Sequence, residues 1–317
     1  MSHLLIYMPA LNEEETIYNV LNSIPKEILG YNDVRLLVVN DGSTDHTEAE
    51  ALRANAVVLT HKRNKGVGSA FTTAVNYALK SKADVLVSID ADGQFDVKQI
   101  AEMIAPINGS KADFCIGNRF YDKRPENMPL LKYWGNKQVN KLIGFISEEK
   151  INDASCGFRA YSRESLMNLN LHGSFTYTHE VILDLLNKGY SLSQVPVNVT
   201  YFEDRESRVA SNLISYAVKT SKISLKCLRD YKPFYFFGIV ALGFFLVSFF
   251  LGAFVAAHWM FTGSITPYKS FGIISLIMFL VSILFLVLAL LADMLGRIRH
   301  NQEKILALIK GQAYEKD

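Results

Sequence analysis

The sequence has little of what marks several common protein classes. Its 317 residues include three cysteines, Cys115, Cys156 and Cys227, whose spacing fits neither a zinc site nor a disulfide framework. We therefore expect reduced cysteines that serve in packing. Lysine and arginine number 33 against 31 aspartates and glutamates, so the strong basic excess typical of nucleic-acid-binding proteins is absent. The N-terminal residues also lack the basic segment and apolar run of a signal peptide.

Charge is absent from two long stretches, residues 234–257 and 270–292. Each exceeds the roughly 20 helical residues that cross a hydrocarbon core of about 30 Å. We predict two transmembrane helices within residues 233–295, with buried core helices as the alternative. Basic residues flank the pair, whereas residues 258–269 contain only Lys269 as lysine or arginine. The N-terminal domain and both termini should therefore lie in the cytoplasm, at the inner or plasma membrane in a bacterium.

Two further segments have amphipathic patterns. Residues 209–232 contain apolar positions such as Leu213, Ala217, Leu225 and Leu228 among basic residues, which favours a helix lying on an anionic leaflet, with a plain linker as the alternative. In the tail, residues 296–317, apolar residues recur at helical spacing: Ile298, Ile305, Leu308 and Ile309. This tail helix is expected to pack on the N-terminal domain or on a second copy of the chain.

The N-terminal 208 residues alternate apolar strands with helical segments. We predict strands at residues 4–8, 34–39, 57–59 and 85–89. Acidic residues after Asn12 suggest the start of one helix, and Ser43 or Thr44 could cap the next. This alternation predicts a parallel sheet with helices on both faces.

Polar residues follow the predicted strands at one edge of that sheet, where open α/β sheets bind ligands. Asp90 and Asp92 are alternate residues of an extended segment, so their carboxylates can converge with Gln94 on Mg²⁺ or Mn²⁺. An ordinary Asp-Gly turn is the alternative. Asp41 is placed to accept a hydrogen bond from a nucleoside, and the loop containing Lys62 could face phosphate.

Four segments in order resemble the motifs of family-two glycosyltransferases of the GT-A fold: residues 8–14, 39–45, 64–70 and 90–94. Residues 117–119 and 153–160 further resemble the branch that moves a sugar onto a polyprenyl phosphate, the dolichol-phosphate mannose synthase-like enzymes. The resemblance extends from residue 1 to about residue 209. It implies a GT-A (Rossmann-like) mixed α/β sheet over residues 1–208, followed by an amphipathic interface helix and two transmembrane helices.

The resemblance also implies roles for the matching residues. The nucleotide would contact Pro9, Leu11, Glu13, Asp41, Lys62 and Asp90, and the metal would bind Asp90, Asp92 and Gln94. Asp90, Asp92, Arg119 and Asp153 would be the catalytic residues, with Asp153 either a positioning group or a base. The acceptor phosphate would contact Lys132, Arg205 and Arg208. Residues 201–208 lack the glycine of the family segment, so only Ser207 and Arg208 align without a gap.

The implied reaction is metal-dependent, inverting transfer of a sugar from a UDP- or GDP-sugar to undecaprenyl or dolichyl phosphate. Two alternatives stay open. The first is a processive polysaccharide synthase. Such enzymes resemble one another in a Gln-x-x-Arg-Trp segment, and neither tryptophan of this sequence, Trp134 or Trp259, lies in such a segment. A catalytically silent membrane scaffold could also keep the fold, although the intact Asp90, Asp92 and Gln94 set speaks against it. The oligomeric state is open, and a homo-oligomer is one expectation.

Overall fold

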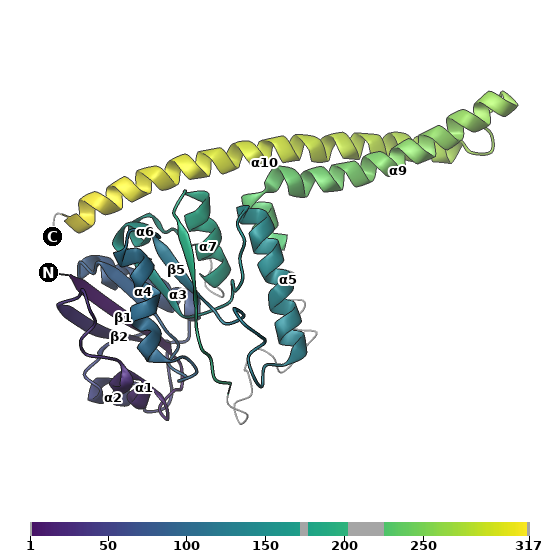
Figure 1. Cartoon of the computed structure of the whole chain (residues 1–317). Helices are drawn as coiled ribbons and strands as arrows, with labels where there is room; N and C mark the ends of the chain where they lie inside the picture. Colours follow the sequence, from purple (N-terminus) through teal and green to yellow (C-terminus); the bar gives the residue numbers. More distant parts are fainter. Residues whose placement is uncertain (1, 172–176, 202–224, 316–317) are drawn as a thin grey trace. The chain divides into compact units, whose positions relative to one another are not determined.

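The computed structural model describes residues 2–171, 177–201 and 225–315 (Figure 1). The chain divides into two compact units, Met1–Thr220 with Glu303–Asp317, and Ser221–Gln302. Arg205, Arg208 and most of the predicted amphipathic helix lie outside the described residues, whereas residues 225–231 are helical.

The first unit is built on a seven-stranded sheet with the strand order β3-β2-β1-β4-β6-β5-β7. The strands are β1 (His3–Ala10), β2 (Asp33–Asn40), β3 (Val57–Thr60), β4 (Val85–Ser88), β5 (Phe114–Asn118), β6 (Arg159–Ser162) and β7 (Leu192–Pro196). The pairs β1–β2, β1–β4, β2–β3 and β5–β7 are parallel, whereas β6 is antiparallel to both β4 and β5. The sheet is therefore mixed, as the family resemblance implied, and the parallel sheet expected from the strand-helix alternation alone is wrong at β6.

Helices cover both faces of this sheet because alternate strand residues point to opposite sides. On one face Leu4, Ile6 and Met8 join a buried cluster with α1 and α4. On the other face Tyr7 packs against Phe71 of α3. The helices of this unit are α1 (Ile17–Ser23), α2 (Thr47–Arg53), α3 (Val67–Lys80), α4 (Ile100–Asn108), α5 (Leu130–Ser147), α6 (Arg163–Asn168) and α7 (Tyr177–Asn187), with a 3₁₀ turn at Val97–Gln99.

The loops before α1 and α2 are hydrogen-bonded to each other, and both helices begin later than the sequence predicted. The backbone N of Asn12 donates to Ser43 Oγ (3.0 Å), and Thr44 N donates to Asn12 Oδ1 (2.9 Å). The Ser43 hydroxyl and the Asn12 side chain are thus used in contacts between the loops. Neither Ser43 nor Thr44 caps a helix, because the residue before α2 is His46. The expected helix start after Asn12 was also wrong, because α1 begins at Ile17 and has no acidic residue in its first turn.

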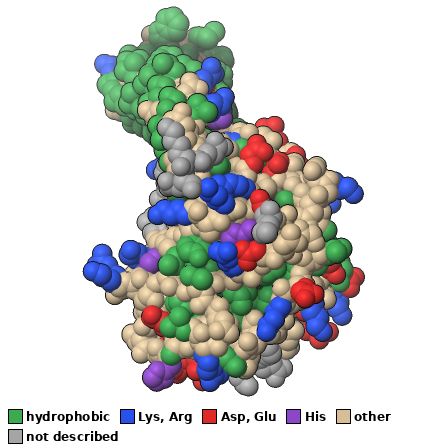
Figure 2. Space-filling view, turned by 90° about the vertical axis from the view of Figure 1, so that its left-hand side faces the viewer, with side chains coloured by type: hydrophobic (Ala, Val, Ile, Leu, Met, Phe, Trp, Pro, Cys, Tyr) green, Lys and Arg blue, Asp and Glu red, His purple; other side chains and the backbone are tan. Residues whose placement is uncertain are grey.

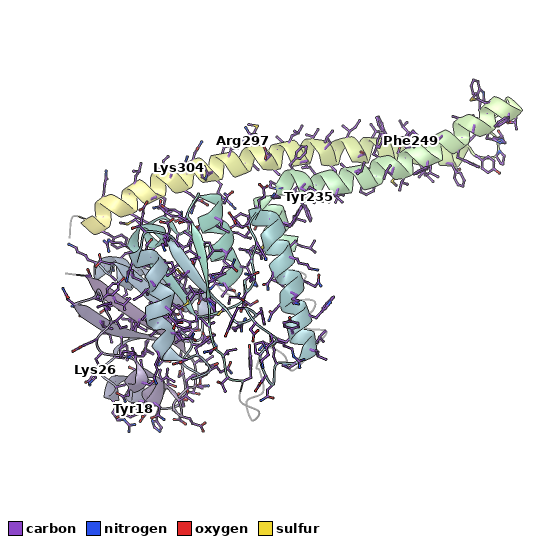
Figure 3. All side chains as sticks on the ribbon, in the orientation of Figure 1. Tyr18, Lys26, Tyr235, Phe249, Arg297 and Lys304 are labelled. Carbon is purple, nitrogen blue, oxygen red and sulfur yellow. The ribbon has the colours of Figure 1, made fainter. Side chains whose placement is uncertain are left out.

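The second unit contains α9 (Pro233–Thr262) and most of α10 (Lys269–Glu315), two helices long and apolar enough to cross a membrane. Hydrophobic side chains cover their exposed surface (Figure 2), and Tyr235 and Phe249 project from α9 (Figure 3). The two helices are joined by hydroxyl groups. Ser248 Oγ donates to the Ser275 carbonyl and Ser275 Oγ to the Ser248 carbonyl, each at 2.8 Å.

The last residues of α10 belong to the first unit and pack there through polar side chains. Lys310 Nζ donates to the Leu169 carbonyl (2.8 Å) and to Asn170 Oδ1 (2.9 Å). Glu303 Oε2 lies 3.2 Å from Nζ of Lys188 at the end of α7. The apolar residues of the predicted tail pattern, Ile305, Leu308 and Ile309, are exposed. The tail thus packs on the N-terminal domain, one of the two expected arrangements, but not through these apolar residues, for which packing on a second copy of the chain stays a prediction.

Replacing Lys188 with methionine is expected to destabilise the first unit by about 3 kcal/mol. Its ammonium group lies 2.7 Å from Asp184 and 3.2 Å from Glu303, and all three side chains are about nine-tenths buried. The variant would leave two buried carboxylates without their cation. The melting temperature in detergent should fall by about 8 °C.

The matched control is Lys123→Met, which removes an exposed pair with Glu126. It should change the melting temperature by no more than about 1 °C. Equal melting temperatures for the two variants would contradict a structural role for the buried cluster.

Candidate active site

Two carboxylates lie just beyond the carboxyl end of β4. Asp90 is half-buried, and among the described residues no group donates a hydrogen bond to its carboxylate. Burial, together with the negative charge of Asp92, raises the pKa of Asp90 to about 7, against the opposing effect of Arg119 and Arg159. Two acidic groups held this close without enough positive charge form an energetically unfavourable pair in the absence of a cation.

The backbone of Gly157 closes one side of Asp90. A Cβ atom added at Gly157 would lie 2.5 Å from Asp90 Oδ2 and 2.8 Å from Oδ1. No side chain larger than hydrogen therefore fits here while Asp90 keeps its place. The segment that contains Gly157 sets the position of the Asp90 carboxylate.

These residues fit a hard divalent cation. Carboxylate oxygens are its preferred protein ligands, and a bound cation would relieve the repulsion that raises the pKa of Asp90. Within the described part of the chain, no group of three or more His, Cys, Asp or Glu side chains gathers as a complete metal cage. The remaining ligands would come from Gln94, water or substrate oxygens, as is usual for Mg²⁺ at phosphate sites. The backbone N of Gln94 donates to Asp92 Oδ1 at 3.0 Å, which fixes the turn between them.

Arg119 and Asp153 form a buried, two-pronged ion pair. Arg119 follows β5, and its Nε and Nη2 donate to the two oxygens of Asp153 at 2.7 and 2.8 Å. The backbone N of Arg119 donates to the same carboxylate at 3.1 Å. Asp153 is fully buried. Its oxygens are thus engaged by Arg119, an arrangement suited to holding a guanidinium group in place.

A second layer of polar contacts holds the Asp153 segment. The buried Arg159 donates to the carbonyls of Cys156 (2.7 Å), Ala154 (2.7 Å) and Thr178 (2.8 Å). Asn140 of α5 accepts from Ala154 N at 2.9 Å. Because these bonds join α5, α7 and β6, the position of Asp153 depends on three separate elements.

Lys132 of α5 is a second cation beside this pair. Its Nζ lies 5.0 Å from the centre of the Tyr201 ring, while Arg119 Nη1 donates to the Tyr201 hydroxyl at 3.1 Å. Burial and then the Arg119 charge lower the pKa of Lys132, and the charge of Asp92 acts in the opposite direction. The structure thus brings Lys132, Arg119 and the Asp90–Asp92 pair into one electrostatic environment.

Asp41, at the end of β2, organises the basic loop after β3. Its carboxylate accepts from the backbone N of Lys65 (2.9 Å) and of Gly66 (2.7 Å), and His61 Nδ1 lies 2.7 Å away. A carboxylate has about four acceptor positions, so capacity for one further donor remains. Lys62 of this loop is exposed.

The remaining predicted nucleotide residues follow β1. Pro9, Leu11 and Glu13 are half-buried, and Glu13 is near enough to contribute to the raised pKa of Asp90. Thr16 Oγ1 donates to the Ala91 carbonyl at 2.9 Å, which ties the β1 loop to the segment between Asp90 and Asp92. Lys62 is exposed on its loop, and its predicted role rests on that loop alone.

Sequence reasoning missed three residues of the site: His61, Arg159 and Tyr201. Arg159 could have been suspected, because a charged residue at the start of a buried strand must find partners. His61 had the weaker signal of a histidine at the end of a strand. No local signal marks Tyr201, because its place depends on contacts with residues far away in the sequence.

The mixed sheet, with a carboxylate pair and buried cations at its edge, defines a glycosyltransferase of the GT-A type. The family model for "Glycosyl transferase family 2" matches residues 5–169. The chain belongs to this family.

Two relatives carry names that refer to dolichyl phosphate or to polyprenol. The UDP-N-acetylglucosamine–dolichyl-phosphate N-acetylglucosaminyltransferase of Methanococcus voltae is 30% identical over 71% of this chain and 98% of its own. The polyprenol monophosphomannose synthase of Mycolicibacterium smegmatis is 28% identical over 68% and 83%. A glucosyl-3-phosphoglycerate synthase from Mycobacterium tuberculosis, solved with Mn²⁺ and uridine diphosphate, shares the fold with a TM-score of 0.56, at 20% identity over 72% and 79%.

Proposed function

We propose that this glycosyltransferase moves a sugar from a nucleotide-sugar to a polyprenyl phosphate at the cytoplasmic membrane surface. The observation on which this rests is the convergence of Asp90 and Asp92 with the cations Arg119 and Lys132 at one edge of the sheet. The carboxylate pair suits a metal-bound diphosphate, and the two cations suit a second phosphate. The relatives that act on dolichyl or polyprenol substrates support the lipid acceptor.

In this mechanism Asp90, Asp92 and Gln94 would hold Mg²⁺ or Mn²⁺. When bound, the metal ion supplies positive charge that stabilises the nucleoside diphosphate leaving group. The carboxylates are already placed by Gly157 and by the turn at Gln94, so little reorganisation is needed as charge develops.

The acceptor needs orientation more than deprotonation. A phosphate monoester has a second pKa near 6 and is largely a dianion at neutral pH. Arg119 and Lys132 would orient it against the sugar carbon, and one direct displacement inverts that centre. We assign Asp153 to positioning, because its carboxylate already accepts three hydrogen bonds from Arg119. Arg205 and Arg208 are proposed as further acceptor contacts.

The nucleoside would bind between the loops after β1 and β2. Pro9 and Leu11 provide apolar surface for a base, and the remaining acceptor capacity of Asp41 suits a base N–H group. Glu13 would contact the nucleoside near the metal site, and Lys62 the diphosphate. Selectivity among bases would follow from such hydrogen bonds, because an unmatched buried polar group is costly.

The surface of α5 supports a membrane-embedded acceptor. Leu130, Leu131 and Trp134 are exposed on the helix that also provides Lys132. The exposed lysines Lys137 and Lys141 follow on the same helix. Exposed leucine and tryptophan beside lysine suit the boundary of an anionic leaflet. We propose that this end of α5 enters the lipid headgroup layer.

Replacing Trp134 with aspartate is expected to lower transfer to undecaprenyl phosphate in anionic vesicles about tenfold. Transfer to a short, water-soluble prenyl phosphate should stay within about twofold of wild type, because the Trp134 side chain is exposed at the surface. The control is Leu29→Asp, which places the same charge on a residue that is 97% exposed and lies before β2. Equal losses on both acceptors would contradict the membrane role of α5.

The deciding experiment is transfer of radiolabelled sugar by purified protein in detergent. UDP- and GDP-sugars are offered with undecaprenyl or dolichyl phosphate, in Mg²⁺, Mn²⁺ or EDTA. Metal-dependent label in the lipid phase would support the proposal and identify the donor. Label in a water-soluble polymer would favour a polysaccharide synthase, and absence of transfer from every donor would contradict the proposed reaction.

A further inference from the structure

Tyr201 lies between the two cations of the active site and contacts each with a different part of its side chain. Its hydroxyl oxygen accepts a hydrogen bond from Arg119 Nη1 at 3.1 Å. Its ring faces Lys132, whose Nζ is 5.0 Å from the ring centre. One neutral side chain thus offers a lone pair to the guanidinium group and a π face to the ammonium group.

The two cations need such a neutral partner. Arg119 lies close enough to Lys132 to lower its pKa, after the effect of burial, so the two groups repel each other. Burial is also the largest influence on Tyr201 and raises the pKa of its phenol, which is therefore neutral at physiological pH. Asp153 compensates the charge of Arg119 but has no contact with Lys132 among the described residues. Tyr201 is the described side chain that touches both.

Tyr201 is itself fixed to the metal-binding segment. The preceding residue, Thr200, donates its backbone N to the Gln94 carbonyl at 2.9 Å, and Val199 forms a β-bridge with Phe95. Asn127 Nδ2 donates to the Tyr201 carbonyl at 3.4 Å. The ring therefore moves with the turn that follows Asp92, and the distance between the carboxylate pair and the two cations depends on this short stretch of backbone.

We propose that Tyr201 is a positioning residue that sets the separation of Arg119 and Lys132 from each other and from the metal-binding carboxylates. Its hydroxyl orients Arg119 for the reacting phosphates, and its ring keeps Lys132 directed at the acceptor phosphate. This assignment rests on the proposed function, because it gives the two cations their phosphate partners. In this assignment Tyr201 acts through its contacts with the two cations.

Two substitutions separate the two contacts. Tyr201→Phe removes the hydroxyl and keeps the ring, so kcat should fall about tenfold while the KM for the lipid phosphate stays within about twofold. Tyr201→Leu removes both contacts and should in addition raise that KM about tenfold. Tyr121→Phe, at an exposed tyrosine, is the control and should match wild type. A purely structural role would lower the melting temperature of both variants and leave the KM unchanged.

A second measurement needs no turnover. Inorganic phosphate is titrated at constant ionic strength, with Mn²⁺ and UDP present, and its binding is followed by thermal shift. Its dissociation constant should rise about tenfold in Tyr201→Leu and no more than about twofold in Tyr201→Phe. Equal constants in wild type and Tyr201→Leu, or an unchanged kcat in Tyr201→Phe, would overturn the proposal. Failure of sugar transfer by wild type would refute the proposed reaction alone, because phosphate binding still tests Tyr201.

Discussion

Asp90→Asn is expected to raise the melting temperature of the metal-free protein and to abolish most sugar transfer. The pKa of Asp90 is raised to about 7, chiefly by burial and then by Asp92. The unfolded chain ionises this group near its ordinary pKa, so the folded state loses stability as the pH rises from about 4 to about 7. Asparagine does not ionise and avoids that loss. At pH 8 the variant should melt about 5 °C higher, and at pH 4 the two proteins should be nearly equal.

The same substitution removes a ligand of the proposed metal ion, so transfer should fall about a thousandfold. Adding Mn²⁺ should raise the melting temperature of wild type and leave that of Asp90→Asn nearly unchanged. The melting curves can be followed with a thiol-reactive dye, because Cys115 and Cys156 are buried in the folded protein. Equal melting temperatures at pH 8 without metal would show that Asp90 is not held in an unfavourable charged state.

Gly157→Ala is expected to lower kcat about a hundredfold, although it adds a single methyl group. The added Cβ would lie within 2.9 Å of three atoms of the Asp90 carboxyl group. The carboxylate must therefore move, and a displacement of about 1 Å in a reacting geometry costs about two orders of magnitude in rate. Because the metal is held less well, the concentration of Mn²⁺ that gives half-maximal rate should also rise.

The matched control for this glycine is Gly189→Ala, where no atom lies within 4 Å of the added Cβ. Gly189 has a φ of +85°, so alanine there strains the backbone and should lower the melting temperature while kcat stays near wild type. If Gly157→Ala also lost stability but kept its kcat, the placement of Asp90 by Gly157 would be wrong.

The parts of the fold that the sequence predicted correctly depend on local patterns. The apolar run at residues 85–89 predicted a strand, and β4 spans Val85–Ser88, two residues before Asp90. The family resemblance and the mixed GT-A sheet are confirmed, as are helices on both sheet faces. The position of β6 between β4 and β5 was not predictable from strand-helix alternation, because it is set by pairing with strands about 45 to 75 positions earlier in the chain.

The residues of the candidate site likewise fall into those with a local sequence signal and those placed by contacts between distant parts of the chain. The spacing of Asp90 and Asp92 is a local signal and could be found from the sequence. The pairing of Arg119 with Asp153 joins residues 34 positions apart, and the contact of Arg119 with Tyr201 joins residues 82 apart. Such contacts follow from the completed sheet. The assignments of all these residues to metal, nucleotide or acceptor contacts stay predictions, as do those of Asp41, Lys62, Arg205 and Arg208.

The polar packing of the C-terminal end of α10 bears on how the enzyme can be simplified for study. Residues 303–315 supply Glu303 and Lys310 to buried contacts with Lys188, Leu169 and Asn170. A fragment ended before α9, to obtain a protein free of detergent, would lose this last part of its own fold. Joining residues 303–315 to such a fragment through a flexible linker would restore the missing charges. The two ends of the sequence thus belong to one folding unit, although the apolar hairpin separates them in the chain.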